Sequence, residues 1–340
     1  MSNTPIKDQF NRPLRDLRIS VTDRCNFRCT YCMPAEIFGE HYEFLKKDQI
    51  LSFEEITRLV NIIVRLGAVK LRLTGGEPLV RRELHTLVGQ LDAIDGVEDI
   101  AMTTNAKLMT PEVAQQLREA GLKRVTISLD SLDDDVFSRM NGNRATVGDV
   151  LRGIEAAEDA GLGPIKINTV VQKGVNDHTI VDLAAFCKEK GYIPRFIEYM
   201  DVGTRNGWEM THVVPAKQII ERINAKMPLV PAEKNYYGEV ALRYRYADGE
   251  GEMGIIASVT QPFCGSCTRM RLSPEGQLYT CLFATKGTDL KTPLRDGATD
   301  DEIEQIVRNT WGHRIDRYSE DRKAGVPASG DKIEMYYIGG

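Results

Sequence analysis

Six of the seven cysteines in this 340-residue chain fall into two tight groups. The first group is Cys25, Cys29 and Cys32, with the spacing Cys-x3-Cys-x2-Cys. Thiolates this close together can hold one iron–sulfur cluster or one zinc ion. A closed zinc site needs a fourth ligand, from His41 or a distant cysteine, whereas three thiolates on a four-iron cluster leave one iron free to bind another molecule. The spacing favours a cluster, and a zinc knuckle is the alternative.

The second group is Cys264, Cys267 and Cys281, and it is followed by arginines rather than by further ligands. Arg269 and Arg271 come directly after Cys267, and on a strand they would point to the same face. Two guanidiniums beside a metal centre would form a pocket suited to phosphate oxygens. A zinc ribbon with solvated arginines is the alternative. No Gly-x4-Gly-Lys-Ser/Thr motif occurs, so a nucleotide here would not be held by a P-loop.

Short β-rich runs alternate with amphipathic stretches over the first two-thirds of the chain. Such β-then-α units predict parallel strands with right-handed crossovers, in a barrel or an open sheet. Chemistry in either architecture gathers at the carboxyl ends of the strands. We expect an α/β fold with a partial (β/α)6 TIM-type barrel. The expected strands are residues 17–21, 69–74, 99–104, 124–129, 164–171 and 194–199, and the expected helices are 52–67, 81–94, 110–121, 146–160 and 179–191.

The pattern changes after about residue 210. One helix is predicted over 215–227, then short β-like runs over 237–247 and 251–260, and a last helix near 299–310. This indicates a smaller C-terminal α+β region packed on the barrel. We therefore divide the chain into residues 1–210, which carry the first cysteine group, and residues 211–340, which carry the second group, the paired arginines and a Gly-Gly ending.

Composition places the chain among globular proteins. It has 42% hydrophobic and 27% charged residues, and its net charge of -5 argues against a nucleic-acid partner. No apolar run approaches the roughly 20 residues of a membrane span, and the first residues lack the apolar stretch of a signal peptide. Clustered cysteines, odd in number, are typical of metal or redox chemistry in a reducing compartment. We expect a cytoplasmic protein with no membrane partner.

The first cysteine loop resembles the signature of the radical S-adenosylmethionine superfamily, including Tyr31 before the last cysteine. The segment Gly75-Gly76-Glu77-Pro78 resembles the glycine-rich turn of that superfamily, where missing side chains let the methionine amino group approach. The resemblance implies a 4Fe–4S cluster on three cysteines, with the fourth iron chelating S-adenosylmethionine. It also implies that reductive cleavage of S-adenosylmethionine yields a 5′-deoxyadenosyl radical, which abstracts hydrogen from a substrate.

Within that superfamily the chain resembles the GTP 3′,8-cyclase family of molybdenum cofactor biosynthesis, from residue 14 to residue 340. One departure is Ala106, where that family usually has glycine, and it bears on the tightness of that turn. The motifs that carry the resemblance are DRCNFRCTYCMP, LRLTGGEPLVR, TTN at 103–105, SLDS at 128–131, KINTV from 166, FIEYMD at 196–201, the CTRMRL segment and the ending MYYIGG.

The resemblance assigns roles to residues of this chain. It implies two 4Fe–4S clusters, one on Cys25, Cys29 and Cys32 and a second on Cys264, Cys267 and Cys281, whose open iron meets the guanine of GTP. It implies S-adenosylmethionine contacts from Tyr31, Gly76, Ser128 and Met200. It implies GTP contacts from Arg18, Arg72, Thr103, Lys166, Arg269, Met270 and Arg271. The residue types agree, because a cation on a barrel strand is costly unless it meets an anion, in a substrate or in a salt bridge.

The implied reaction abstracts the 3′ hydrogen of the GTP ribose and joins that carbon to guanine C8. The product would be (8S)-3′,8-cyclo-7,8-dihydroguanosine 5′-triphosphate. Expected partners are an electron donor such as flavodoxin or ferredoxin and the downstream cyclic pyranopterin monophosphate synthase, with a homodimer as one option. The pair Gly339-Gly340 is interpreted as backbone that reaches into the active site, where the alternative is terminal slack.

Two other functions compete with this interpretation. One is a peptide-maturing radical enzyme with an auxiliary cluster, which the paired arginines disfavour. The other is a non-enzymatic iron–sulfur electron carrier or zinc-binding scaffold, which would have no use for the Gly-Gly turn.

Overall fold

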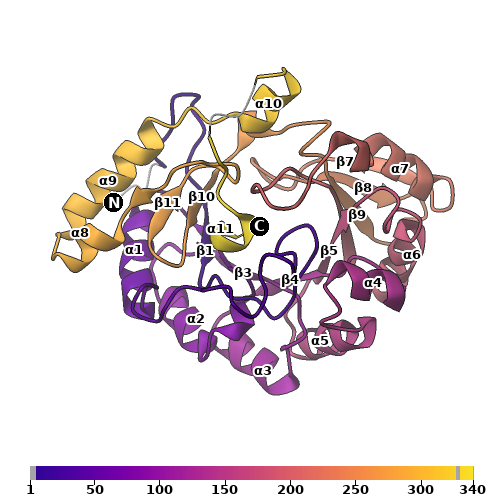
Figure 1. Ribbon diagram of the computed structural model, residues 1–340, viewed down its shortest axis with the longest axis horizontal. Helices are drawn as coiled ribbons and strands as arrows, with labels where there is room; N and C mark the ends of the chain where they lie inside the picture. The colour runs from indigo at the N-terminus through magenta and orange to yellow at the C-terminus, as the bar shows by residue number, and fades with distance from the viewer. Residues whose placement is uncertain (1–4, 327–329, 340) are drawn as a thin grey trace.

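The protein is described by a computed structural model that covers residues 5–326 and 330–339. Within these residues twelve strands form one continuous sheet, in the order β12-β11-β10-β1-β2-β3-β4-β5-β6-β9-β8-β7. The sheet is curved, helices line its outer side, and the C-terminal segment lies in the middle of the curve (Figure 1). The two ends of the sequence therefore contribute to the same barrel.

The first six strands and their helices confirm the predicted (β/α)6 unit. Each strand pairs in parallel with the next one along the chain. Parallel neighbours need a crossover, which the intervening helices provide. The carboxyl ends of all six strands therefore meet at one end of the barrel. The elements are β1 (Asp16–Ser20), α1 (Phe53–Arg65), β2 (Lys70–Thr74), α2 (Leu84–Asp92), β3 (Asp99–Thr104), α3 (Pro111–Glu119), β4 (Arg124–Ser128), α5 (Val147–Asp159), β5 (Lys166–Val171), α6 (Ile180–Lys190) and β6 (Ile193–Glu198).

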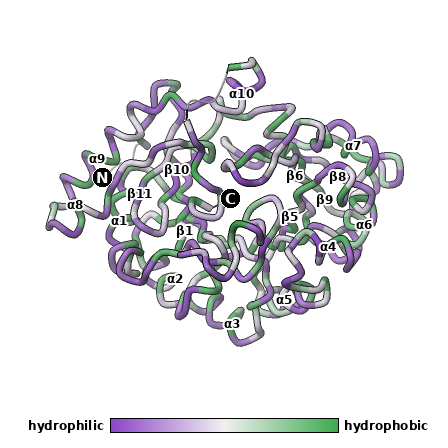
Figure 2. Tube along the Cα trace, in the orientation of Figure 1, coloured by the Kyte–Doolittle hydropathy of each residue, from purple (hydrophilic) through white to green (hydrophobic). Residues whose placement is uncertain are grey.

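The starts of the outer helices and their buried faces agree with the sequence-based prediction. Ser52 and Glu55 form a capping box at the start of α1, which satisfies backbone N–H groups that the first turn leaves free. Along α1, Ile56, Leu59 and Ile63 recur at helical spacing and are buried. Figure 2 shows hydrophobic and hydrophilic residues alternating along the outer helices. No helix in the described part of the chain is long and apolar enough to cross a membrane.

Several elements differ from the sequence-based expectation, among them one helix start, one short helix and one edge strand. α2 begins at Leu84 rather than at residue 81, because Glu83 before it has a left-handed backbone with a φ of 56°. α4 (Asp134–Met140) was not predicted, since a helix of two turns is too short for a clear periodic signal. β7 (Leu229–Ala232) was not predicted either and contains Pro231, which a strand tolerates at the edge of a sheet.

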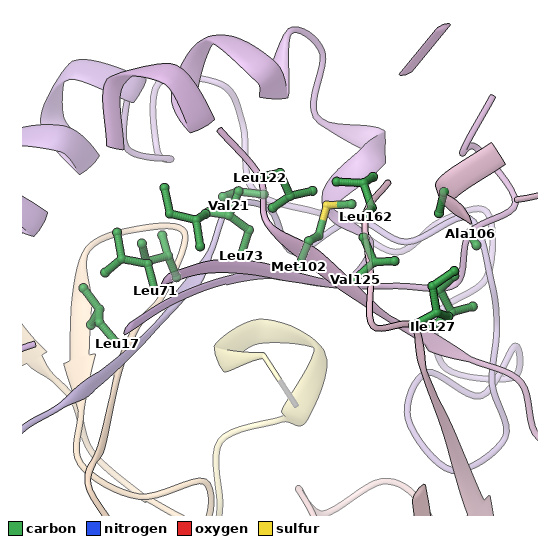
Figure 3. Close-up of a cluster of buried hydrophobic side chains, with 14 of the residues drawn as sticks. Leu17, Val21, Leu71, Leu73, Met102, Ala106, Leu122, Val125, Ile127 and Leu162 are labelled. Carbon is green, nitrogen blue, oxygen red and sulfur yellow. The ribbon is translucent and has the colours of Figure 1, made fainter. Parts of the chain in front are cut away.

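The main apolar core lies between the strands and the outer helices. Leu17, Leu71 and Met102 come from successive strands and are at most 1% exposed. In Figure 3 their side chains lie on the helix side of the sheet, while the short helix α11 (Met335–Ile338) lies on the other side. Side chains alternate along a strand, so Arg18 and Arg72 face the interior of the barrel. The sheet thus separates an apolar layer from a polar interior.

The C-terminal strands extend the sheet at both of its edges. β9 pairs in parallel with β6, and β10 pairs in parallel with β1. The region after residue 210 therefore shares its sheet with the barrel, and the boundary at residue 210 stays a prediction. The remaining elements are α7 (Ala216–Asn224), β8 (Leu242–Tyr246), β9 (Glu252–Ile256), β10 (Arg269–Leu272), β11 (Gln277–Tyr279), β12 (Thr288–Asp289), α8 (Lys291–Arg295), α9 (Asp300–Gly312) and α10 (Tyr318–Lys323).

Candidate active site

A cavity of about 290 Å³ lies inside the barrel, at the carboxyl ends of its strands. Both cysteine groups line it, although they stand near opposite ends of the sequence. All the other predicted site residues line it too, except Lys166 and Met270. The predicted residues that it brings together are Arg18, Cys25, Cys29, Tyr31, Cys32, Arg72, Gly76, Thr103, Ser128, Met200, Cys264, Cys267, Arg269, Arg271 and Cys281.

The first cysteine loop follows β1 and is held by its own backbone and by one arginine. The N–H of Cys32 donates to the carbonyl oxygen of Cys29 at 2.9 Å. The guanidinium of Arg28 donates to the carbonyl oxygens of Cys25 at 2.8 Å and of Phe38 at 2.7 Å. These bonds orient the three half-buried thiols toward the cavity.

The thiols of this loop lie in an apolar and acidic environment. Burial, and then the nearby Glu77 carboxyl, raises the pKa of Cys25 to about 12. Burial, and then Asp130, raises the pKa of Cys29 well above its ordinary value. Thiolates here need a strong positive charge at their sulfur atoms, which a metal centre supplies. The three sulfur donors and their surroundings therefore suit a metal cluster.

The glycine-rich turn after β2 passes very close to the cysteine loop. A Cβ at Gly76 would lie 2.4 Å from the carbonyl oxygen of Arg24, and a Cβ at Gly75 would lie 2.6 Å from that of Thr22. Gly75 also has a φ of 153°, which L side chains rarely adopt. Only glycine lets the two backbones approach this closely. The turn therefore leaves a cradle without side chains beside Cys25.

Glu77 completes this turn, and sequence reasoning assigned it no role. Its buried carboxylate accepts hydrogen bonds from the N–H groups of Leu79 at 3.0 Å and Asn105 at 2.7 Å, and from the hydroxyl of Thr104 at 2.7 Å. Burial raises the pKa of Glu77 to about 7, although these bonds favour the charged form. Glu77 thus ties the end of β2 to the end of β3.

Tyr31, Ser128 and Met200 lie around the same cavity. The hydroxyl of Tyr31 donates to Asp130 at 2.8 Å, and Asp130 also accepts from the N–H of Val170 at 2.9 Å. Burial raises the pKa of Asp130 to about 6. Asp130 therefore orients the ring of Tyr31 beside the cysteine loop. Its signal in the sequence is its place in the SLDS motif, just after the fourth strand.

The second cysteine group has a cationic environment. Cys264 and Cys267 stand in a short 3₁₀ turn, with the N–H of Cys267 donating to the carbonyl oxygen of Cys264 at 3.1 Å. The guanidinium of Arg269 donates to the Cys267 sulfur at 3.1 Å. Burial alone would raise the pKa of Cys267, but Arg269 and Arg314 outweigh it and lower this pKa to about 6. Cys267 is therefore stable as a thiolate near neutral pH, whereas burial raises the pKa of Cys264 and raises that of Cys281 to about 12.

Buried cations gather in the barrel interior below the cysteines. Arg72 donates to the hydroxyls of Thr103 at 3.0 Å and Thr126 at 3.2 Å, and its guanidinium pairs with no carboxylate of the described residues. Burial, and then Arg18, lowers the pKa of Arg72 to about 9. Burial, and then Arg271, lowers the pKa of Arg18. These arginines destabilise one another until an anion lies between them, as the sequence analysis anticipated.

Lys166 and Met270 are the two predicted residues outside the lining. Lys166 is on the same face of β5 as Asn168, which lines the cavity, so it points into the barrel one step deeper. Met270 is fully buried in the main core, on the face of β10 opposite Arg269 and Arg271. The Met270 side chain therefore points away from the cavity. A contact between Met270 and a bound molecule would have to come from the Met270 backbone.

Arg195 lines the cavity and was missed by sequence reasoning. It lies on β6 beside Asn168 of β5. Its signal was the one used for Arg18 and Arg72, a cation inside a predicted barrel strand. Burial, and then Arg195, lowers the pKa of Lys166 to about 7. Arg195 therefore belongs to the cationic group.

The C-terminal segment enters this site. Arg271 donates to the carbonyl oxygen of Gly339, and a Cβ at Gly339 would lie 2.1 Å from the Thr74 side chain. The backbone of Gly339 thus reaches the interior, and Gly340 lies outside the described residues. His41, considered as a zinc ligand, is exposed, and no described group of His, Cys, Asp and Glu side chains is placed to hold a single metal ion.

Comparisons with known proteins agree with this geometry. The Radical SAM superfamily model matches residues 19–187, and the Molybdenum Cofactor Synthesis C model matches residues 193–320. The chain is 49% identical over 360 residues to the GTP 3′,8-cyclase of Acidothermus cellulolyticus, which covers 99% of each chain. It is 50% identical over 336 residues to that of Xanthomonas axonopodis pv. citri, again with 99% of each chain covered. The similarity thus extends over the full length.

Among solved structures, the chain is similar to Streptococcus suis SuiB bound to S-adenosylmethionine. The TM-score is 0.59 at 16% identity, covering 86% of this chain and 68% of that one. A second SuiB structure has a TM-score of 0.61 at 14% identity, covering 93% of this chain and 69% of that one. At this identity the likeness concerns the fold, and it supports the partial barrel.

Proposed function

This chain belongs to the GTP 3′,8-cyclase family, and we propose that the cavity between its two cysteine groups is where it acts on GTP. It is a radical S-adenosylmethionine lyase that converts GTP to (8S)-3′,8-cyclo-7,8-dihydroguanosine 5′-triphosphate, the first step of molybdenum cofactor biosynthesis. The observation that carries the location is the meeting of six cysteines and several buried cations at one cavity. The cysteines suit metal clusters, and the cations suit a triphosphate.

The first cysteine loop suits the 4Fe–4S cluster of the superfamily. Cys25, Cys29 and Cys32 would hold it, because their thiols line the cavity and their surroundings favour a bound cation. When bound, the reduced cluster and S-adenosylmethionine supply the radical that abstracts a hydrogen atom from the substrate. The role of the chain is to hold these ligands and to keep side chains away at Gly75 and Gly76.

The S-adenosylmethionine contacts are proposed for residues around that cradle. Gly76 lets the turn lie directly against the backbone of the cysteine loop at Arg24, so that its own backbone stays beside the cysteines for the amino acid part of the ligand. Tyr31 is fixed by Asp130, and Ser128 and Met200 close the same part of the cavity. Each of these residues ends or follows a barrel strand, where a TIM-type barrel places its ligands.

A second 4Fe–4S cluster is proposed for Cys264, Cys267 and Cys281. Three sulfur donors with no nearby fourth ligand would again leave one iron free, and the cavity extends from that group to the buried cations. The guanidiniums of Arg269 and Arg314 stabilise the Cys267 thiolate, so the chain prepares this ligand before metal binding. A free iron at this position would face guanine while the triphosphate lies deeper.

The triphosphate is proposed to lie among the buried cations. Arg18, Arg72, Lys166 and Arg195 surround the barrel interior, and burial together with like-charge repulsion lowers the pKa of each. An anion at their centre offsets both the desolvation of these side chains and the repulsion between them, and so favours their charged forms. Thr103 accepts from Arg72 and orients it. Arg269 and Arg271 stand at the second cysteine group, between this pocket and the proposed cluster.

The remaining partners follow from the reaction. An electron donor such as flavodoxin or ferredoxin is proposed to reduce the cluster, and the cyclic pyranopterin monophosphate synthase to consume the product. A homodimer and a cytoplasmic location remain predictions. The peptide-maturing and electron-carrier alternatives are disfavoured, because the full-length relatives quoted above are all GTP 3′,8-cyclases.

The test is an anaerobic assay of the reconstituted protein with dithionite, S-adenosylmethionine and GTP. We expect 5′-deoxyadenosine and an isomer of GTP, identified by mass spectrometry. The same assay with Arg72→Gln and Arg18→Gln tests the location of the triphosphate. Cleavage of S-adenosylmethionine with unchanged turnover of GTP in both variants would contradict the proposed phosphate pocket.

A further inference from the structure

A buried network of charged side chains lies behind the second cysteine turn. Asp8 and Arg12 come from the N-terminal segment, and Arg314 follows α9 near the other end of the chain. The side chains of Asp8, Arg12 and Arg314 are 0%, 1% and 2% exposed. The Asp8 carboxylate lies 2.5 Å from Nε of Arg12 and 3.6 Å from Nη1 of Arg314. One carboxylate thus joins two buried guanidiniums from distant segments.

The two guanidiniums form hydrogen bonds with the backbone of the two cysteines in that turn. Nη1 of Arg12 donates to the carbonyl oxygen of Cys264 at 2.9 Å, and Nη1 of Arg314 donates to that of Cys267 at 2.9 Å. Arg12 also donates to the carbonyl oxygen of Asp316 at 2.8 Å. The turn itself spans few residues, and its internal backbone bonds join Cys267 to Cys264 and Ser266 to Phe263. From outside, Glu320 accepts from the N–H of Gly265 at 3.2 Å, and the two arginines are the donors to the cysteine carbonyl oxygens.

Stability alone does not explain the network. The free energy lost when several charges are desolvated usually exceeds the free energy gained from their attraction. A buried network that stabilises a protein is also fully hydrogen-bonded. Nη2 of Arg12 is buried and has no hydrogen-bond partner among the described residues. Arg12 also does not line the cavity, so its charge does not serve a substrate. Besides the Asp8 carboxylate, its guanidinium donates to the carbonyl oxygens of Cys264 and Asp316.

We propose that Asp8 and Arg12, with Arg314, are positioning residues that hold Cys264 and Cys267 at the spacing that the second metal centre requires. This inference rests on the proposed assignment of a second cluster to that group. It goes further in naming the N-terminal segment as part of that site's support, a role that no motif in the segment signals. The first cysteine loop is independent of the network, because Arg28 supports it.

The experiment uses that independence as an internal control. Asp8→Asn and Arg12→Gln are purified without metal, and the cysteines are alkylated with iodoacetamide and mapped by mass spectrometry. We expect Cys264 to react about tenfold faster than in the parent in both variants, because its part of the turn opens locally. Cys267 should respond in Asp8→Asn, which removes the carboxylate beside both arginines, but not in Arg12→Gln, where Arg314 still holds it. Cys25 should react at the parent rate in both. The matched control is Arg243→Gln, which removes a guanidinium that pairs with Glu252 and donates to the carbonyl oxygen of Glu233 rather than to a cysteine.

Anaerobic reconstitution gives a second measurement. The parent should take up about eight iron atoms per chain, and the variants about four, held at the first site. If the parent itself takes up only about four, the second-cluster assignment fails, whereas the alkylation pattern still tests the positioning role. Equal alkylation of both groups in variant and parent would overturn the inference. So would faster alkylation of both groups together, which indicates general destabilisation.

A conservative variant covers the case in which Asp8→Asn does not fold. Arg12→Lys keeps the charge that faces Asp8 but cannot reach all three acceptors of the guanidinium. We expect a folded protein in which Cys264 alone of the two turn cysteines becomes more reactive, since Arg314 still holds Cys267. Parent-like reactivity of Cys264 in this variant would overturn the role of Arg12.

Discussion

Arg18 and Arg271 are direct register partners across the parallel strands β1 and β10. On its other side Arg18 is the register partner of Arg72 on β2. Three guanidiniums therefore stand in a row across the sheet, all on the face that lines the barrel interior. Like charges directly opposite one another destabilise a sheet. The row is the clearest physical sign that this fold is built to receive an anion.

Removing one charge from this row should raise the free energy of unfolding while lowering the affinity for GTP. In Arg18→Gln, the GTP-free protein should gain about 1 kcal/mol in the free energy of unfolding, since a buried, repelled charge is lost. The affinity for GTP should fall at least about tenfold. Urea unfolding and calorimetric titration measure the two effects. A variant that is less stable and binds GTP as the parent does would show that Arg18 has a structural role.

Lys166 should couple GTP binding to protonation. Burial and the neighbouring arginines lower its pKa to about 7, so the amine is partly neutral near neutral pH. A bound triphosphate favours the charged form and raises this pKa, so binding takes up a proton and the affinity falls as the pH rises from about 6 to 8. Titration calorimetry in buffers of different ionisation enthalpy measures this uptake. It should disappear in Lys166→Met, and proton uptake equal to the parent's would exclude Lys166 as the group.

Gly76→Ala should disrupt the S-adenosylmethionine site by steric overlap. The new Cβ would lie 2.4 Å from the carbonyl oxygen of Arg24, and backbone must move to relieve it. We expect the affinity for S-adenosylmethionine to fall at least about tenfold, measured by equilibrium binding. Gly148→Ala is the matched control, because its Cβ would meet nothing closer than 3.6 Å. Equal affinities in the two variants would contradict the close approach.

Ala106 shows the cost of the one departure from the family pattern. It has a left-handed backbone with a φ of 60°, which costs a non-glycine residue about 1–2 kcal/mol. Ala106→Gly relieves this strain, but it raises the conformational entropy of the unfolded chain and removes a buried methyl group. These effects oppose each other, so the free energy of unfolding should change by less than about 0.5 kcal/mol. The control Ala114→Gly, buried in α3, should lose about 1–2 kcal/mol. Equal losses in urea unfolding would show that the strain is absent.

Asp201 should make stability depend on acid pH. Burial raises its pKa, but Tyr318, Arg322 and Lys332 outweigh burial and lower it below the ordinary value. A carboxyl whose pKa is lower in the folded protein stabilises it above the unfolded pKa of about 3.9 and loses that effect as the pH falls through the folded pKa. Asp201→Asn should therefore cost about 3 kcal/mol at neutral pH, because it leaves two cations without their partner. The cost should shrink as the pH falls below about 4, and a cost that is constant with pH would contradict the ionic role.

Sequence reasoning predicted the parts of the site whose signals are local. The six cysteines, the glycine-rich turn and the predicted cations other than Lys166 line one cavity, and so do the other predicted site residues except Met270. Arg195 carried the same signal and was overlooked. Glu77 and Asp130 were quoted within motifs, but nothing in the sequence shows that one ties two strand ends together and the other orients Tyr31. Such hydrogen bonds depend on which strands become neighbours.

The sequence by itself determined the ligand groups, the helix caps and the order of β/α units, because each is encoded within a few residues of the chain. Only the tertiary structure decided that β10 pairs with β1, which places Arg271 beside Arg18, and that Arg12 reaches Cys264. Parallel pairing between strands so distant in sequence depends on which sheet edges remain open once the barrel unit has formed. No local pattern records that choice. The pairing of β10 with β1 is stabilised by burial of the strand faces and by hydrogen bonds at the open edges of the sheet.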